Sequence, residues 1–352
     1  MAKRFFILIS ILLFTGFGCQ EKSKIATTGA DPTKESAVSA KKVPIEPSWY
    51  KTGQNFKAKV SLTSDLIMMA PLRMDKTDLK KTVMVLNYKV IEADQQQATI
   101  EITVESIHAT MVTIGRKFGY DSEDVKVAKS ISNPENKKGA KQQQDKFANS
   151  FSEVKGQKYI ARINRDGQVI SLDIQGNILK KEASGQPRGE MIGGDQLTML
   201  FNEYALKAYA SPLLWSGAKD FDADKNQELG LKTTVVLPFM KPFQLNRKVS
   251  TVSEDSQTKI DYTLALTESE YSTVKEGKVY YTPKEISPDA KGNAIYSKTH
   301  LRVNYLNDSF KLKINSLNLP AQSKGKNNVV MLYTYDRTIE PIETIIKDKL
   351  NN

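Results

Sequence analysis

The chain has 352 residues, of which 39% are hydrophobic and 26% are charged, a composition that allows a folded globular body. Its single cysteine excludes an internal disulfide, so the stability of the fold must come from packing. The formal charge of +11 comes mainly from scattered lysines, as in the pairs Lys80–Lys81 and Lys180–Lys181. Such lysines indicate a solvated surface, with attraction to anionic lipid or polysaccharide as the alternative. Because no Arg-rich stripe or aromatic platform accompanies them, we expect no nucleic-acid partner.

The first residues have the layout of a secretory signal. Lys3 and Arg4 precede an apolar run, Phe5–Phe14, and small residues follow before Cys19. The run is shorter than the about 20 residues that a membrane-spanning helix needs. We therefore expect residues 1–18 to be a signal peptide.

Cys19 is the expected site of lipidation. Gly16 and Gly18 suit a signal peptidase, and the cysteine directly after them resembles the lipobox of bacterial lipoproteins. The lipobox usually has Leu three places before the cysteine, where this chain has Gly16. Ordinary cleavage near Gly18, giving a soluble secreted protein, and a retained anchor helix are the alternatives. Several acyl chains of the palmitate type would hold the mature protein firmly on a bilayer.

Residues 19–48 are expected to form a flexible tether between this anchor and a folded body. They are rich in Lys, Ser, Ala, Thr and Pro and have no apolar period, so they cannot bury enough surface to offset their ordering entropy. Gln20 follows the cysteine, where Asp would indicate an inner-membrane address by analogy with enteric lipoproteins. We therefore expect an outer-membrane lipoprotein that faces the periplasm, with its body at residues 49–352.

The body is dominated by a period of two. Apolar residues alternate with polar ones from Phe56 to Leu62 and from Ile100 to Val104, which is typical of antiparallel strands with one buried face. Tyr159 to Ile163 and Val169 to Ile174 flank Asp166–Gly167, a sequence typical of a β-hairpin.

Further strands are expected toward the end of the chain, with a turn at Asn307–Asp308. The expected ranges are 258–266, 274–282, 301–306, 310–317 and 329–335. About ten to twelve strands result, too many for one flat sheet. The expected fold class is mainly β, with antiparallel curved sheets or an open barrel.

One amphipathic helix is expected at the centre of the chain. Asp195 can cap its start, Pro212 ends it, and its apolar stripe consists of Leu197, Leu200, Phe201, Tyr204, Ala205 and Ala208. The stripe is typical of a helix packed on the concave face of a sheet, and the lining of a ligand cavity by its aromatic residues is the alternative. A short C-terminal helix is expected near Pro341, and residues 133–145 are expected to form a long polar loop.

The chain also hints at an internal duplication. Gln97–Val104 resembles Gln257–Leu264, and each follows an acidic turn and another strand. Two similar halves, 49–190 and 228–340, would then be joined by a helical segment, 191–227. The match is short, and alternating strands resemble one another by default, so both possibilities stay open.

No catalytic or metal-binding motif is visible, and no cofactor is expected. His108 and His300 have no carboxylate or second histidine at ligand spacing, and no nucleophile elbow or phosphate loop occurs. We therefore expect no enzyme, although a carboxylate pair of a hydrolase can assemble in the fold alone. Two segments suit binding. The methionine-rich Leu66–Met74 suits adaptable contact with lipid or peptide, with a buried strand that enters a bend at Pro71 as the alternative. The proline-containing Val235–Phe243 either forms the rim of an apolar cup or covers an edge.

With Cys19, the tether and the strand order in hand, the chain resembles an uncharacterised family of bacterial exported lipoproteins. The resembling stretches are Lys51–Phe56, Gly119–Ser122, Gly156–Tyr159 and Asp166–Val169. The resemblance covers most of residues 50 to 340 and implies a β-rich domain without assigned activity or catalytic residues. The sequence thus predicts a non-enzymatic envelope lipoprotein that binds an apolar ligand or a partner protein. A structural or assembly module of the envelope is the alternative.

Overall fold

The computed structural model describes residues 50–342 except 71–72, 114–115, 125–136, 166–167, 184–193, 211–220, 238–241, 268–272, 276–278, 299–301 and 319–326. All of them belong to one compact unit, Glu46–Asn352. The expected signal peptide, Cys19 and the tether lie outside the described residues and stay predictions. Within the described ranges, no helix is long and apolar enough to cross a membrane.

The described strands form one antiparallel sheet of 14 strands. The strands before the central helices are β1 (Asn55–Ala70), β2 (Arg73–Ala93), β3 (Gln97–Thr113), β4 (Arg116–Asp121), β5 (Lys158–Asn164) and β6 (Val169–Ile174). The strands after them are β7 (Glu228–Val235), β8 (Phe243–Ser253), β9 (Gln257–Leu266), β10 (Thr273–Lys275), β11 (Val279–Ile286), β12 (Lys291–Ser297), β13 (Arg302–Asn318) and β14 (Asn327–Ile342). The predicted mainly β class with a curved antiparallel sheet is confirmed.

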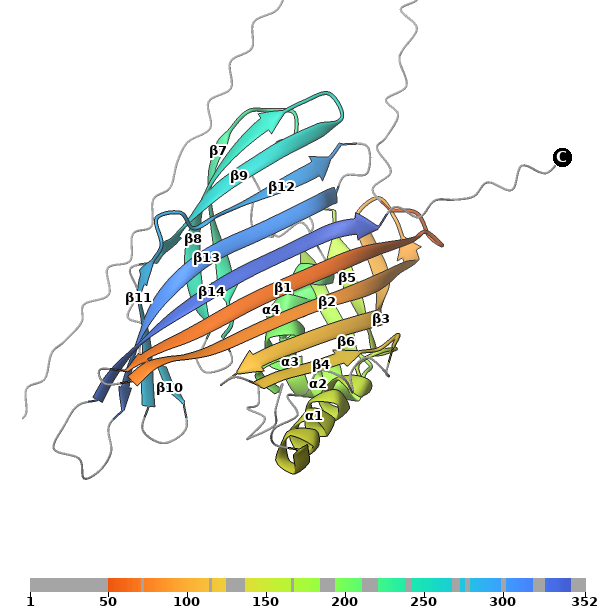
Figure 1. Ribbon diagram of the computed structural model, residues 1–352. Coiled ribbons are helices and arrows are strands. Elements are labelled where there is room, and N and C mark those ends of the chain that lie inside the picture. Colours follow the sequence, from red (N-terminus) through yellow and green to blue (C-terminus); the bar gives the residue numbers. More distant parts are fainter. Residues whose placement is uncertain are drawn as a thin grey trace, which may run out of the picture. The chain divides into compact units, whose positions relative to one another are not determined.

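The sheet is a meander whose first and last strands meet in its middle. Its order is β6-β5-β3-β2-β1-β14-β13-β12-β9-β8-β7, while β4 pairs with β3, and β11 pairs with β10 and β13. The long pairs β2–β1–β14–β13 form the centre of the curved sheet (Figure 1). The two ends of this path are β6 and β7, and the central helices lie between them in the chain.

The alternating sequence pattern explains which face of the sheet is buried. In β3, Ile100, Ile102 and Val104 are buried while the residues between them are partly exposed. Strand β8 alternates between buried and exposed residues in the same way. The other face has cross-strand ion pairs such as Lys57–Glu105 and Lys158–Glu101. Because each strand turns its apolar side to the same face, one continuous core forms there.

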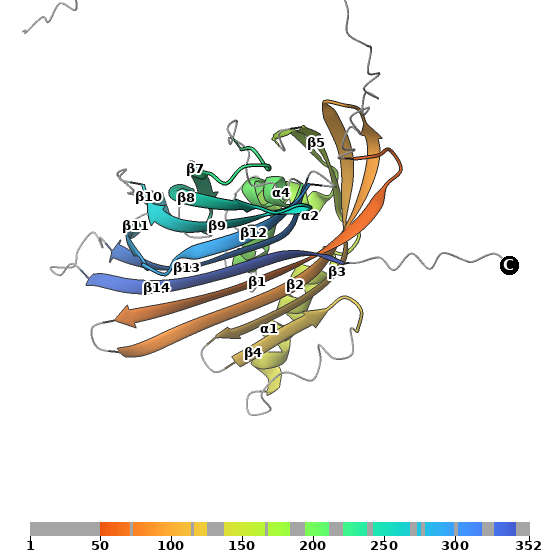
Figure 2. The ribbon, with the colours of Figure 1, turned by 90° about the horizontal axis from the view of Figure 1, so that it is seen from above.

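Four helices occur in the described part of the chain, namely α1 (Lys137–Ser152), α2 (Asn177–Ala183), α3 (Gly194–Phe201) and α4 (Glu203–Ala210). Helices α2 and α4 lie on the concave side of the curved sheet, between β5 at one end and β7 and β8 at the other (Figure 2).

Two buried tyrosines attach α4 to the first part of the sheet. The hydroxyl of Tyr88 donates to the carbonyl of Tyr209 at 3.0 Å, and that of Tyr159 donates to the carbonyl of Leu206 at 3.1 Å. The Tyr209 carbonyl is one of the last of α4, which have no partner within the helix. The bond from Tyr88 satisfies it, and the two bonds together attach the helix to the sheet. On α3, the Gln196 amide donates to the Thr82 hydroxyl at 2.5 Å.

The central helix was expected to be continuous, but the structure divides it at Asn202 into α3 and α4. Its apolar stripe is confirmed at every position except one, because the side chain of Tyr204 is exposed. Ala205 and Ala208 lie beyond the break and are still buried. Asp195 lies in α3 and Pro212 lies outside the described residues.

The expected polar loop at residues 133–145 was wrong from Lys137 onward, because α1 begins there. Phe147 and Phe151 are fully buried and lie near Phe118 and Tyr120 of β4. The Gln144 amide bonds to both backbone groups of Gly119. These three side chains of α1 lie on one helix face. The sequence did not predict the helix because most of the residues before Phe147 are polar.

Two strand predictions were also wrong. Asn307 and Asp308 do not form a turn, because β13 continues through them and pairs them with Thr338 and Arg337 of β14. The range 274–282 is not one strand but the hairpin of β10 and β11. Turn propensity was overridden by pairing in the first case, because the carboxylate of Asp308 has cationic partners on the buried face.

The remaining predictions concern turns and ends. Strands β5 and β6 pair as the expected hairpin, while Asp166–Gly167 lies outside the described residues. Pro341 and Ile342 end β14 and so do not begin a helix, and residues 343–352 are not described.

The two hairpins that suggested a duplication have similar turns. The Asp94 amide donates to the Gln97 carbonyl at 2.9 Å, and the Glu254 amide donates to the Gln257 carbonyl at 2.8 Å. Short antiparallel turns share this bond in general, so the duplication, with its halves 49–190 and 228–340 and joining segment 191–227, stays a prediction.

Candidate functional site

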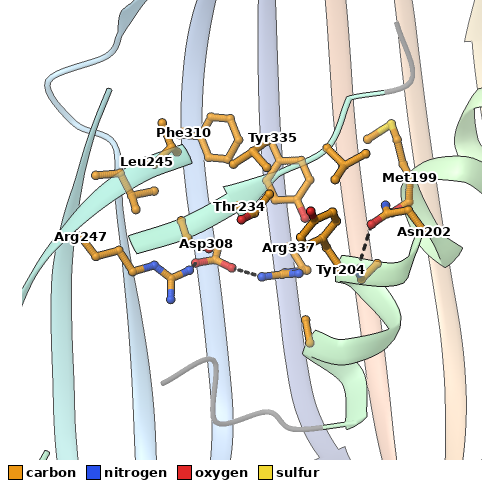
Figure 3. A pocket seen from close by; sticks show the side chains of 16 residues that line it. Met199, Asn202, Tyr204, Thr234, Leu245, Arg247, Asp308, Phe310, Tyr335 and Arg337 are labelled. Atoms are coloured by element: carbon orange, nitrogen blue, oxygen red, sulfur yellow. Dashed lines mark hydrogen bonds and ion pairs between the residues drawn. The ribbon is translucent and has the colours of Figure 1, made fainter. Parts of the chain in front are cut away.

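A pocket lies between helices α3–α4 and the second part of the sheet, with walls from β7, β8, β9, β13 and β14 (Figure 3). The space that water can occupy in it is about 70 Å³, room for roughly five water molecules. It is therefore a small site and not a large cavity of the kind that encloses a whole lipid.

Most of the pocket wall is apolar. Leu245, Leu264 and Phe310 contribute from the sheet, and Met199 and Ala205 from the helices. These residues lie on the buried faces of their strands and helices. The alternation of apolar residues that forms the core therefore also forms the pocket wall.

The rim of the pocket is formed by β7 and α4. Tyr204 is 45% exposed, and residues 233–236 are partly exposed, yet all of them line the pocket. The expected binding segment Val235–Phe243 begins here, which favours the rim among its two interpretations. Residues 238–241 of that segment are not described.

A buried cluster of three charged side chains forms the polar end of the pocket. Asp308 of β13 lies between Arg247 of β8 and Arg337 of β14 (Figure 3). Its Oδ1 is 3.1 Å from Nη2 of Arg247, and its Oδ2 pairs with Nη2 of Arg337. The side chains of Arg247 and Asp308 are 2% and 5% exposed, and that of Arg337 is 11% exposed. Buried charges of this kind are tolerated because they are paired.

Tyr262 of β9 completes the cluster by crossing a neighbouring strand. Its hydroxyl donates to Oδ1 of Asp308 and to the carbonyl of Asn307, while its ring lies 4.5 Å from the guanidinium carbon of Arg247. Tyr262 and Asp308 both pair in register with Gly292 of β12, which separates their strands. The absence of a side chain at Gly292 lets the tyrosine ring pass over the backbone.

The cluster holds Asp308 in its ionised form. Burial alone would raise the pKa of the Asp308 carboxyl, but Arg337 and Arg247 outweigh it and hold this pKa below 3.8. Two guanidinium groups therefore face one carboxylate, which leaves an excess of one positive charge.

Several nitrogens of the two arginines remain unpaired. Within the described residues, Nε and Nη1 of Arg247 and Nε of Arg337 have no hydrogen-bond partner. Both residues line the pocket, so these buried donors without a partner belong to the side chains at its polar end.

The helical side of the pocket is shaped by Asn202. Its Oδ1 accepts from the Ala205 amide at 3.0 Å, which caps the start of α4, and its Nδ2 donates to the carbonyls of Thr198 and Met199. One side chain thus satisfies backbone groups at the end of α3 and at the start of α4, and it fixes the angle between them.

The structure places His108 away from this pocket. Contrary to expectation, His108 has a carboxylate neighbour, because Nδ1 lies 3.2 Å from Asp121 across the β3–β4 pair. Asp121 also accepts from the amides of Glu123 and Asp124, as a turn cap does. The described residues contain no group of three potential metal ligands. His300 and the side chains of Met68, Met69 and Met74 lie outside what the structure describes.

Sequence reasoning missed Arg247, Asp308 and Arg337, although a signal existed. Each charged residue points to the apolar face of its strand. The residues two positions before and after Arg247 are Leu245 and Val249, and those around Asp308 are Leu306 and Phe310. A charge in the buried phase indicates a paired or functional group.

No protein-family model and no curated protein matches this sequence. Among solved structures, a lipovitellin chain from a study of lipid–protein interactions has a TM-score of 0.39 and 10% identity, over 83% of this chain and 25% of its own length. This chain thus spans about a quarter of that lipovitellin chain. An outer membrane channel from Pseudomonas putida F1 has a TM-score of 0.21 and 6% identity, over 85% of this chain and 99% of the channel. Both scores are too low to support an argument about function.

Proposed function

We propose that this chain is a non-enzymatic lipoprotein of the bacterial cell envelope that binds a small, partly apolar ligand. Cys19 would anchor the protein to the outer membrane, with the folded body facing the periplasm. The leader and the lone cysteine support the anchor. The observation that supports binding is the pocket between α3–α4 and the sheet, whose wall is apolar and whose rim is partly exposed.

The chemistry of the pocket favours binding over catalysis. Its charged groups are two arginines and a carboxylate with a lowered pKa. An arginine does not release its proton at neutral pH, and a carboxylate with a low pKa is a weak general base. These groups can orient a charged molecule, but they are poorly suited to move a proton.

The alternative role in assembly has weaker support. The two ends of the sheet path, β6 and β7, have only 6 and 8 residues, and Glu228 and Lys232 place charges on β7. Short, charged edge strands resist pairing with another chain. We therefore favour the pocket over the sheet edges as the functional site.

Mass spectrometry of the full chain, purified from its native membrane, tests both parts of the proposal. We expect a mature protein that begins at Cys19, carries acyl chains and retains a small molecule without a covalent bond. A Cys19→Ser variant should leave the membrane fraction but keep the bound molecule, since the pocket is distant in sequence from the anchor. An intact leader in the cytosol would contradict the location, and a pocket that is empty in both forms would contradict the binding role.

A further inference from the structure

We infer that the pocket takes a ligand with a singly charged oxyanion, a carboxylate or phosphate-type group, and that Arg247 and Arg337 bind it. This inference rests on the proposed function and names the chemistry of its ligand. An apolar part of the ligand would lie along the wall toward the rim at Tyr204.

The first argument is the balance of charge. Asp308 pairs with both arginines, but it compensates only one of them. The charged residues that line the pocket are these three. Removing an uncompensated charge from water is costly, and one anion in the pocket would complete the pairing.

The second argument is the unused hydrogen-bonding capacity. The unpaired nitrogens of Arg247 belong to a side chain that is only 2% exposed, so solvent reaches them poorly. An N–H group of a guanidinium forms a strong, charge-assisted hydrogen bond to an oxygen of a carboxylate or phosphate. The nitrogens left over from the Asp308 pair are therefore suited to an oxyanion.

The third argument is the fixed geometry of the two arginines. The ring of Tyr262 lies against the guanidinium of Arg247, and Arg337 is the direct register partner of Asp308. Asp308 thus holds both cations at the polar end of the pocket, while Leu245 and Phe310 line the apolar wall. The small volume fits a head group better than a whole lipid.

Calorimetric titration of the full chain tests the inference with three probes, namely decanoate, decanol and inorganic phosphate. The chain should carry Cys19→Ser, so that no attached acyl chain competes. We expect decanoate to bind more tightly than decanol, because only the acid supplies the anion. Arg247→Met should weaken decanoate binding by about tenfold or more, and it leaves Asp308 paired with Arg337.

Lys248→Met is the matched control. It removes the same charge from the next residue of β8, whose side chain is 73% exposed, and decanoate should bind as it does to the parent chain. If Arg247→Met does not fold, Arg247→Lys replaces it. This variant keeps the charge but loses the additional N–H donors of the guanidinium, and it should bind decanoate several-fold more weakly.

The outcomes separate this inference from the proposed function. Decanol that binds as tightly as decanoate, with no effect of Arg247→Met, would overturn the oxyanion site but keep an apolar ligand. If phosphate binds as tightly as decanoate and Arg247→Met weakens both equally, the decyl chain contributes nothing to binding. That result would support the oxyanion site but contradict the apolar ligand. A pocket that binds none of the probes would overturn the inference.

Discussion

Gly292 shows how one residue decides whether the buried cluster can form. A Cβ atom at this position would lie 2.4 Å from both the Tyr262 ring and the Asn307 carbonyl. The carbonyl belongs to the backbone of β13 and cannot move away easily. The bond from Tyr262 to Asp308 therefore depends on the absence of a side chain at Gly292.

Gly292→Ala should lower the free energy of unfolding by about 1–3 kcal/mol, the usual effect of inserting a methyl group into a packed region. Urea denaturation followed by circular dichroism measures this change. Gly230→Ala in β7 is the matched control, because a Cβ atom there would meet nothing within 4 Å. Alanine in a strand loses less entropy than glycine, so the control should be neutral or slightly stabilising. Equal losses in the two variants would contradict the crossing of Tyr262 over Gly292.

At the scale of the element, the break between α3 and α4 determines the shape of the pocket. A continuous helix would leave the Ala205 amide bonded within the helix and would place Tyr204 on the buried stripe. Instead, Asn202 caps the second helix and is itself 6% exposed. Tyr204, in the first turn of this helix, lies exposed at the rim of the pocket.

Asn202→Ala should lower the free energy of unfolding by about 1–2 kcal/mol, because it removes an N-cap. Asn149→Ala on the exposed side of α1 is the control and should change stability by less than about 0.5 kcal/mol. Urea denaturation gives both values. A gain of stability in Asn202→Ala would indicate that the helix prefers to be continuous and would contradict the assigned role of the cap.

At the scale of the whole molecule, the concave face is filled by buried tyrosines as well as by aliphatic residues. Burial raises the pKa of Tyr159, Tyr209, Tyr262 and Tyr333 above 10. In the unfolded chain these hydroxyls ionise near pH 10, whereas in the folded protein they stay neutral. The unfolded state therefore holds fewer protons at alkaline pH, and the stability that the tyrosines contribute below pH 10 is lost as the pH rises above it.

We expect the free energy of unfolding to fall steeply above about pH 10, by about 1.4 kcal/mol per pH unit for each such tyrosine. Tyr159→Phe should reduce this slope by the amount of one tyrosine. At pH 7 the free energy of unfolding of the same variant should be only about 1 kcal/mol lower, because the hydrogen bond to the Leu206 carbonyl is lost. Urea denaturation at pH 7 and over an alkaline series distinguishes the two effects. An unchanged slope would contradict the buried position of Tyr159.

The sequence predicted the faces of the strands but not the site that they build. Alternation placed Ile100, Ile102 and Val104 on one face correctly, because side-chain direction in a strand depends only on position in the chain. The same rule could have indicated Arg247 and Arg337 as buried charges. That these two charges share Asp308 could not be predicted, because Arg247 and Arg337 are 90 residues apart in the sequence and the strands β13, β12 and β9 separate β14 from β8 in the sheet.

Local sequence patterns correctly predicted which face of each strand is buried and most of the apolar stripe of the central helix. Only the tertiary structure decided that Asp308 lies within a strand, that α1 is a helix, and that the central helix breaks at Asn202. For Asp308 and α1, partners distant in sequence changed the local preference, whereas at Asn202 the side chain bonds to neighbouring backbone groups. The physical reason is that the energy of a buried charge or aromatic ring depends on its neighbours in space.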